Sequence, residues 1–382
     1  VFINPFKNSE YTKYNIFCST NLVFFLLRFI ITKNKNDKKF PLSKYLIFAA
    51  LGTVCDVMPL RGLNRFLILE AINSYDLNNE NPFSYILKIK KINRKLTIDD
   101  LGYLIGPILN SGGRLGKSNL ATKLLISENK KEIEALSKQL LEINEKRKKI
   151  EEKALNKIDK KLSKNTNYIF HIENNISEGI LGIIAARLVE KYNVPVILAT
   201  NSGDIYKGSA RSIENVDIGK ILLTLSQKGI LIKGGGHEMA GGFSIKRKNI
   251  KILDQSLQKQ IKLKKNNKTN YYLSKNSLSL VNDKFLKDLG KIAPFGNKNS
   301  SPKYLFENIK IIKKKIINEK HIFFVAKSGN KSCDGISFNS VNDPIGDNIL
   351  FNKNNLSIVS ELKESNYKNK PRLQLILKDV IA

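Results

Sequence analysis

The chain has no tryptophan, and it holds only three cysteines, three histidines and two methionines among 382 residues. The cysteines (Cys18, Cys55 and Cys333) are odd in number and never spaced as Cys-x-x-Cys, which argues against a disulfide framework or a zinc site and for a reducing, cytoplasmic location. The most apolar run, Leu22–Ile31, is short and interrupted by an arginine, so it predicts a core segment and excludes a membrane span. No charged-then-apolar leader opens the chain, so no signal peptide is expected.

Acidic side chains are scarce as well: 34 aspartates and glutamates face 65 lysines and arginines, which gives a net charge of +31. This excess suggests a polyanionic partner. Lysine, asparagine and isoleucine are abundant throughout, however, as codon bias in an AT-rich genome would produce, so the charge alone supports nucleic-acid binding only weakly. Only ten of the basic residues are arginines, and each is more informative because a guanidinium offers phosphate a planar fork of donors.

The most informative stretch is Lys233–Ile245, which reads KGGGHEMAGGFSI. Its three consecutive glycines predict a short turn without Cβ atoms, whose backbone N–H groups form an anion-binding concavity just before His237. A glycine-rich hairpin with a stray histidine is the alternative, and it is favoured for an isolated motif. A second small-residue segment, Lys207–Ser212 (KGSARS), lies upstream and adds hydroxyls and a guanidinium.

Two further segments complete a set of four ordered motifs. Residues 51–60 (LGTVCDVMPL), followed by Asn64 and Arg65, resemble the fourth motif of the DHH phosphoesterases. Residues 106–116 (GPILNSGGRLG) resemble the GPRINAAGRL segment of the same superfamily. Together with the GSxRS and GGGH segments, they make the chain similar to the RecJ family of single-strand-specific exonucleases from about residue 3 to the C-terminus.

Two departures from the family pattern concern phosphate or strand contacts. Ile108 stands where the family has an arginine, and Ser177 stands where it has a histidine. Both changes are expected to weaken contacts with the strand more than they alter the fold.

The resemblance implies an α/β fold with a partial DHH domain, a long connecting helix, an α/β DHH-associated domain and a C-terminal OB-like β-barrel. Apolar positions at i, i+3 and i+4 spacing independently predict one amphipathic helix from Asn119 to about Lys164. Strands and helices alternate from Tyr168 onward, and five short strands near the C-terminus favour a small barrel, OB-like or generic. The predicted boundaries are 1–116, 117–164, 165–262 and 270–382, with a linker at Lys264–Thr269.

Asp56 is the candidate catalytic carboxylate and metal ligand. It lies between Cys55 and Val57 in a predicted apolar setting, where a carboxylate needs a partner. A divalent cation and a helix N-cap or Asx turn before Pro59 are equally compatible with the residues. The resemblance implies the cation, as one of two Mn²⁺ or Mg²⁺ ions. The family's other ligands would precede Phe2–Pro5, so we expect that the chain lacks the N-terminal part of a RecJ-like protein and is inactive alone.

The resemblance also implies a grip on a terminal 5′ phosphate by Ser209, Arg211 and Arg114. Arg114 has an alternative as a loop residue near a helix C-terminus. His237, the second candidate catalytic residue, either donates to phosphate or orients water, or it packs under the glycine turn. The complete set expected to bind phosphate is Arg114, Ser209, Arg211, Ser212, Gly234, Gly235 and Gly236.

The implied function is 5′–3′ exonuclease action on single-stranded DNA in repair and recombination. We expect a monomer whose partner is single-stranded DNA, together with a single-strand-binding protein or a helicase, and no membrane contact. A DHH oligonucleotide phosphodiesterase is one alternative, although short substrates do not need the barrel. A non-catalytic single-strand-binding protein is the other, because the upstream metal-ligand motifs are absent from the chain.

Overall fold

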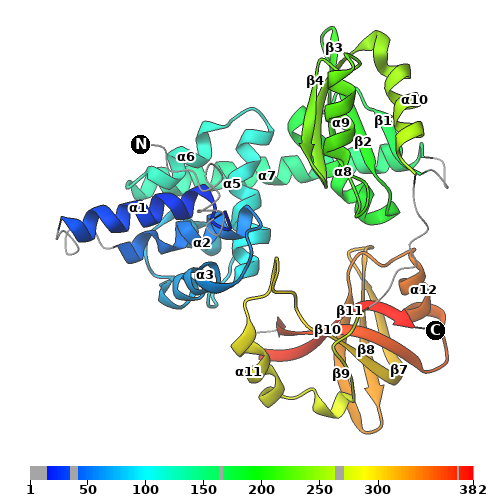
Figure 1. Cartoon of the computed structure of the whole chain (residues 1–382). Helices are drawn as coiled ribbons and strands as arrows, with labels where there is room; N and C mark the ends of the chain where they lie inside the picture. The colour runs from blue at the N-terminus through cyan, green and yellow to red at the C-terminus, as the bar shows by residue number, and fades with distance from the viewer. Residues whose placement is uncertain (1–14, 35–41, 163–166, 263–270, 368–369, 382) are drawn as a thin grey trace. The chain divides into compact units, whose positions relative to one another are not determined.

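The computed structural model describes residues 15–34, 42–162, 167–262, 271–367 and 370–381. The chain falls into two compact units: residues 1–74 together with 267–382, and residues 75–266 (Figure 1). The segments Phe2–Pro5 and Lys264–Thr269, for which the sequence predicted a family motif and a linker, lie outside the described residues. The four-part division predicted from the sequence remains a prediction.

Three helices form the first part of the first unit: α1 (Ser19–Lys33), α2 (Leu46–Cys55) and α3 (Gly62–Ser74). A buried polar network joins them. Asn21 Nδ2 donates to Thr53 Oγ1 (2.8 Å) and to Asn64 Oδ1 (3.0 Å), and all three side chains are fully buried. Asn64, a residue of the fourth-motif segment, therefore fixes helix packing, because its amide must be satisfied inside the core.

The apolar run Leu22–Ile31 lies in α1, but the prediction of a core segment is wrong. Phe24 packs with Ala49 of α2 and Leu67 of α3. A second stripe at i, i+3, i+4 and i+7 spacing is exposed: Val23, Leu26, Leu27 and Ile30. Apolar composition predicts the helix but not how many of its sides are covered. No helix in the described part of the chain is long and apolar enough to cross a membrane.

The second part of the first unit is a closed five-stranded barrel. Its strands follow one another around the barrel in this order: β7 (Lys303–Ile317), β8 (His321–Ser328), β9 (Lys331–Ser337), β11 (Lys370–Ile381) and β10 (Leu356–Tyr367). Pairing of β10 with β7 closes it. Phe306 and Phe324 are fully buried in its core. The predicted OB-like barrel is confirmed.

Short elements complete the barrel unit. Strand β6 (Ser274–Asn276) pairs in parallel with β7. Helix α11 (Asp283–Ile292) precedes β7, and α12 (Pro344–Phe351) lies between β9 and β10 in the chain.

The second unit begins with helices. These are α4 (Pro82–Ile89), a π-helical turn at Asp100–Ile105, α5 (Gly106–Arg114), α6 (Asn119–Ile126) and α7 (Lys130–Asp159). The single helix predicted from Asn119 to about Lys164 is thus two helices. The break occurs because the Asn129 side chain accepts from the backbone N–H groups of Lys131 and Glu132 and starts α7 anew.

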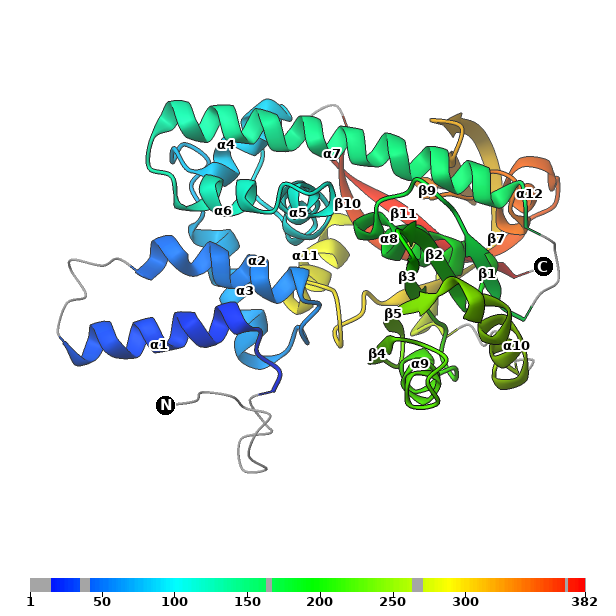
Figure 2. The same cartoon turned by 90° about the horizontal axis from the view of Figure 1, so that it is seen from above.

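A five-stranded sheet follows in the same unit. Its order is β1 (Ile169–Ile172), β2 (Val196–Ser202), β3 (Ile205–Arg211), β5 (Ala240–Lys246) and β4 (Lys233–His237). Helix α8 (Glu178–Tyr192) and the end of α7 cover one face, and α9 (Ile218–Gln227) and α10 (Ile250–Gln260) cover the other (Figure 2). The predicted α/β layout is confirmed.

Candidate nucleic-acid interface

Strand register brings the two predicted small-residue segments onto one sheet. Arg211 at the end of β3 and His237 at the end of β4 both pair with Ala240 of the intervening strand β5. Neighbouring strands lie about 4.8 Å apart, so these two residues lie in one row, about 10 Å from each other. Side chains alternate between faces, and therefore Ser209 shares the α8 face with Arg211.

The three consecutive glycines form a strand rather than the predicted turn, which falls at residues 238–239. A Cβ on Gly234 would lie 2.9 Å from the Leu222 carbonyl oxygen of α9, and a Cβ on Gly219 of α9 would lie 2.7 Å from the carbonyl carbon of Gly236. Both positions serve close packing of α9 on the sheet. Gly235 points to the other face, where a Cβ would meet nothing within 4 Å. Of the three, Gly235 is the one open to a ligand.

Arg211 lies against the first turns of α8. Its Nη1 donates to Ser209 Oγ (3.2 Å) and to the Ala210 carbonyl (2.8 Å). A Cβ on Gly182 would lie 2.8 Å from Arg211 Nη2 and 3.1 Å from Ser209 Oγ. Glycine at position 182 therefore provides the space in which the guanidinium lies.

Arg114 approaches the same helix from the end of α5. Its Nη1 donates to the Gly179 carbonyl (2.8 Å), and its own carbonyl accepts from Ser177 Oγ (3.0 Å). A Cβ on Gly179 would lie 2.7 Å from the Arg114 carbonyl oxygen. Because Gly179 and Gly182 are three residues apart, they lie on one face of α8. Both arginines thus contact this face, which we call the glycine face of α8.

The electrostatics of the two arginines favour an anion. Burial lowers the pKa of Arg211. Burial, and then the charges of Arg147 and Arg211, lower the pKa of Arg114, while Glu151 raises it. Among the described residues, no carboxylate forms an ion pair with Arg114 or Arg211. The N-terminal end of α8 adds a partial positive charge. Two half-buried guanidiniums at a helix N-terminus match the requirements of a phosphate group.

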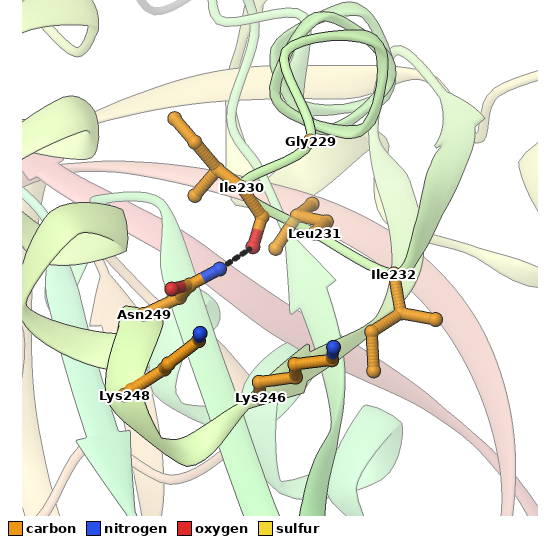
Figure 3. A pocket seen from close by; sticks show the side chains of 7 residues that line it. All are labelled: Gly229, Ile230, Leu231, Ile232, Lys246, Lys248 and Asn249. Carbon is orange, nitrogen blue, oxygen red and sulfur yellow. Dashed lines mark hydrogen bonds between the residues drawn. The ribbon is translucent and has the colours of Figure 1, made fainter.

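A cavity of about 360 Å³ opens beside this cluster, with the ion pair of Lys207 and Glu178 (2.9 Å) at its wall. Its other lining residues are Gly179, Leu181, Gly208, Ser209, Phe243 and Ser244. A second cavity, of about 490 Å³, lies between the α9–β4 connection and the end of β5. Lys246 and Lys248 line it, and Asn249 Nδ2 donates to the Ile230 carbonyl (2.9 Å) (Figure 3). This second cavity contains none of the predicted site residues.

Two other predicted residues have different environments. Ser212 is buried, and its hydroxyl donates to the Val216 carbonyl (2.7 Å), so it closes a turn and does not face the α8 cluster. His237 is exposed at the end of β4 and does not pack beneath the glycines. It lies two strands away from Arg211, at the far end of the same row.

Asp56 belongs to the first unit, whereas the other predicted site residues belong to the second. It is the C-cap of α2 and is exposed, so both the predicted apolar setting and the N-cap alternative are wrong. Apolar neighbours in sequence do not bury a residue that ends a helix. Val57, which follows it, has a φ of 54°, an uncommon value for a β-branched residue.

Residues near the barrel hold the Asp56 turn. Asn297 Nδ2 donates to the Val57 carbonyl (2.6 Å). Arg65 Nη2 donates to the carbonyls of Lys291 (2.7 Å) and Ala293 (2.6 Å), where α11 ends. The helices and the barrel of the first unit are therefore joined at the residue next to Asp56.

The described residues do not provide a two-metal site. No group of three or more histidine, cysteine, aspartate or glutamate side chains that could hold a metal ion exists among them. Asp56 supplies a single exposed carboxylate. We therefore assign no reaction step through a metal to these residues.

Sequence reasoning missed several residues that shape the site. Gly179 and Gly182 lie in the segment that carries the Ser177 departure, and their i, i+3 spacing is the signal that was available. Arg147 belongs to none of the four sequence motifs, although its charge acts on Arg114. Ile108 is fully buried in α5, where an arginine would have to leave the core.

Two family models match the chain. Residues 165–263 match the DHHA1 domain, and residues 274–379 match the RecJ OB domain. This pair defines the class: a DHHA1 domain followed by an OB domain of RecJ type. The resemblance to RecJ that the sequence motifs carried is confirmed by the relatives and structures described next.

Single-stranded-DNA-specific exonuclease RecJ of Escherichia coli strain K12 is 29% identical over 323 residues, which cover 78% of this chain and 55% of that protein. The RecJ protein of Haemophilus influenzae is 32% identical over 219 residues, which cover 53% of this chain and 38% of that protein. The chain spans about half the length of the curated relatives that it matches.

Solved structures show the same fold. RecJ of Thermus thermophilus in complex with Mn²⁺ has a TM-score of 0.74 at 22% identity, covering 91% of this chain and 51% of that chain. Exonuclease RecJ bound to manganese has a TM-score of 0.50 at 25% identity, covering 59% of this chain and 57% of that chain. Related structures therefore contain Mn²⁺, and another was solved with Mg²⁺.

Proposed function

We propose that this chain is the strand-gripping part of a RecJ-type exonuclease that degrades single-stranded DNA from its 5′ end in repair and recombination. Hydrolysis depends on Mn²⁺ or Mg²⁺, and Asp56 is one ligand among others that the described residues do not supply. The protein acts as a monomer, with a single-strand-binding protein or a helicase as partner. The observation that carries the proposal is the pair of arginines on the glycine face of α8, for which the described residues provide no carboxylate in an ion pair.

Each residue of the grip has a distinct part. Arg211 and Ser209 bind the terminal phosphate, and Arg114 supplies a second positive charge beside it. The next nucleotides follow the row of Gly242 and Gly235, which pair with each other beside Ser209 and leave the sheet surface free of side chains. His237, at the far end of the neighbouring row, donates to a later phosphate.

The barrel supports a strand-length substrate rather than a dinucleotide. A closed barrel of OB type is a common platform for single strands. We propose four parts for the chain, at residues 1–116, 117–164, 165–262 and 270–382, in which the DHH-associated part holds the strand end and the barrel holds the strand beyond it. An oligonucleotide phosphodiesterase needs no such second platform.

The test compares two strands that differ only in a 5′ phosphate or a 5′ hydroxyl. Arg211→Ala should weaken binding of the phosphorylated strand about 10- to 100-fold, since charged hydrogen bonds contribute about 1.5–3 kcal/mol. Binding of the hydroxyl strand should change less than about threefold. Arg247→Ala, an exposed arginine of the same unit, is the control for the lost charge. Equal losses on both strands would refute the assignment.

A second candidate function is non-catalytic binding of single strands. The single exposed carboxylate at Asp56 favours it for the chain by itself. We expect no nuclease activity from this polypeptide with Mn²⁺ or Mg²⁺. Metal-dependent cleavage that disappears in Asp56→Ala would contradict this expectation.

A further inference from the structure

Helix α7 carries a buried ion pair beside the proposed phosphate site. Arg147 and Glu151 are each 8% exposed, and Arg147 Nη1 lies 3.1 Å from Glu151 Oε2. Asn144 Oδ1 accepts from Arg147 Nε (3.2 Å). The residues are spaced i, i+4, so the pair is fixed along one side of the helix. Burial of both charges makes their balance matter more than it would in water.

A third charged group joins this pair from α8. Arg187 Nε lies 3.5 Å from Glu151 Oε1, and Arg187 Nη1 lies 3.4 Å from the exposed Glu190. The Glu151 carboxylate thus bridges two arginines on two helices. Removal of its charge would leave Arg147 without its counter-ion.

Helix α7 also lies against α5, the helix that ends in Arg114, because Ser111 Oγ of α5 donates to the Leu140 carbonyl of α7 (3.3 Å). From this position the charges of Arg147 and Glu151 act on Arg114 through space. The charge of Arg147 lowers the pKa of Arg114, and the charge of Glu151 raises it. A phosphate beside Arg114 is negatively charged, so these two charges would act on it in the opposite sense. Arg147 would attract the phosphate, and Glu151 would repel it. Neither residue bonds to Arg114 or Arg211.

We propose that Glu151 and Arg147 are specificity-determining residues that set the net charge of the phosphate site and thereby its preference for a doubly charged terminal phosphomonoester over a singly charged diester. This inference rests on the proposed function of Arg211 and Arg114. A terminal phosphate carries about −1.5 to −2 charges at neutral pH, so a change in the charge of the site affects it more than a diester. The Glu151 carboxylate stabilises the fold by pairing with Arg147, and its negative charge lowers the affinity of the site for phosphate.

The experiment measures Kd for three oligonucleotides of one sequence that end in 5′ phosphate, 5′ methylphosphate or 5′ hydroxyl. In Glu151→Gln, the Kd for the 5′ phosphate should fall about three- to tenfold, the Kd for the methylphosphate should fall by a smaller factor, and the Kd for the hydroxyl should not change. The melting temperature should fall at the same time, because Arg147 loses its counter-ion. A purely structural role would weaken binding together with stability.

Glu145→Gln is the matched control, because it removes the same charge from an exposed position of the same helix. It should leave the preference among the three ends unchanged. Arg147→Gln with Glu151→Gln removes both charges and keeps polar side chains at both positions. Its preference should return to within about twofold of the wild type, even if Arg147→Gln alone does not fold.

The outcomes separate the two proposals. If Arg211→Ala retains the preference for a 5′ phosphate, the proposed function fails. If Arg211→Ala loses that preference but Glu151→Gln leaves it unchanged or reduces it, only the charge-setting role of α7 is overturned. If the double variant keeps the raised affinity of Glu151→Gln, the balance between the two charges is not the cause.

Discussion

The turn at Asp56 and the site formed by Arg114 and Arg211 differ in how many of the groups needed for their proposed roles the described residues supply. Around Arg211, residues of α5 and β3 meet on the glycine face of α8, and charges from α7 act on Arg114. Around Asp56, the described residues contribute hydrogen bonds that hold the backbone but no second metal ligand. The comparison teaches that the proposed phosphate site draws its residues from one folded unit, whereas a two-metal centre needs several carboxylates brought together from separate segments.

The glycines of β4 give the prediction with the largest expected effect. Gly234 packs against α9, whereas Gly235 faces the open surface proposed to bind the strand. Gly234→Ala should destabilise the second unit by about 1–3 kcal/mol, since the new methyl overlaps the α9 backbone. Gly235→Ala should change stability by less than about 0.5 kcal/mol, because its Cβ meets open space. Urea denaturation of both variants provides the measurement. Equal stability of the two would contradict the division of the motif into packing and open positions.

Gly182→Ala tests the position of α8 that leaves room for the Arg211 guanidinium. The new Cβ would occupy the space of the Arg211 guanidinium, so affinity for a 5′-phosphorylated strand should fall about tenfold, or about 1.4 kcal/mol. Stability should hold or rise, because alanine favours a helix over glycine by about 1 kcal/mol. Fluorescence anisotropy and thermal melting measure the two effects. Gly290→Ala, on an open helix position of α11, should raise stability without changing affinity; undiminished affinity in Gly182→Ala would argue against the site.

Val57→Gly tests the Asp56 turn and has the smallest expected effect. Relief of the left-handed backbone at a β-branched residue should stabilise the first unit by about 1 kcal/mol. Lys91, which follows α4 with a φ of 57°, is the matched control in the second unit. Its side chain is unbranched, so Lys91→Gly should stabilise less. Thermal melting decides, and a lower melting temperature in Val57→Gly would show that the turn is not strained.

The sequence predicted the elements well wherever the signal is local. Apolar spacing and nearby turn residues predicted that strands and helices alternate from Tyr168 onward, and the structure has β1 at Ile169–Ile172 and α8 at Glu178–Tyr192 there. Three adjacent glycines, by contrast, suggested a turn, because single residues do not reveal which face of a strand a helix will cover. The charges of Arg147 and Glu151 gained meaning only when folding placed α7 beside Arg114.

The exposure of Asp56 was also beyond local prediction. Burial depends on what packs against a residue, and neighbours in sequence do not specify that. The resemblance to RecJ located Asp56 and Arg211 as candidates, and their roles remain predictions. The register of β3, β5 and β4 is what the structure adds, because it relates His237, Gly235 and Arg211 on one surface.

The bonds between Asn297 and Val57, and between Arg65 and the end of α11, join residues 226–240 positions apart. On the ribosome, the Asp56 turn is therefore synthesised long before the segment that secures it. At about 5–20 residues per second, that delay is about 10–50 seconds. The intervening residues 75–266 form one continuous piece and are free to fold first. The proposed phosphate site can thus form in the nascent chain before the turn at Asp56 gains its last contacts.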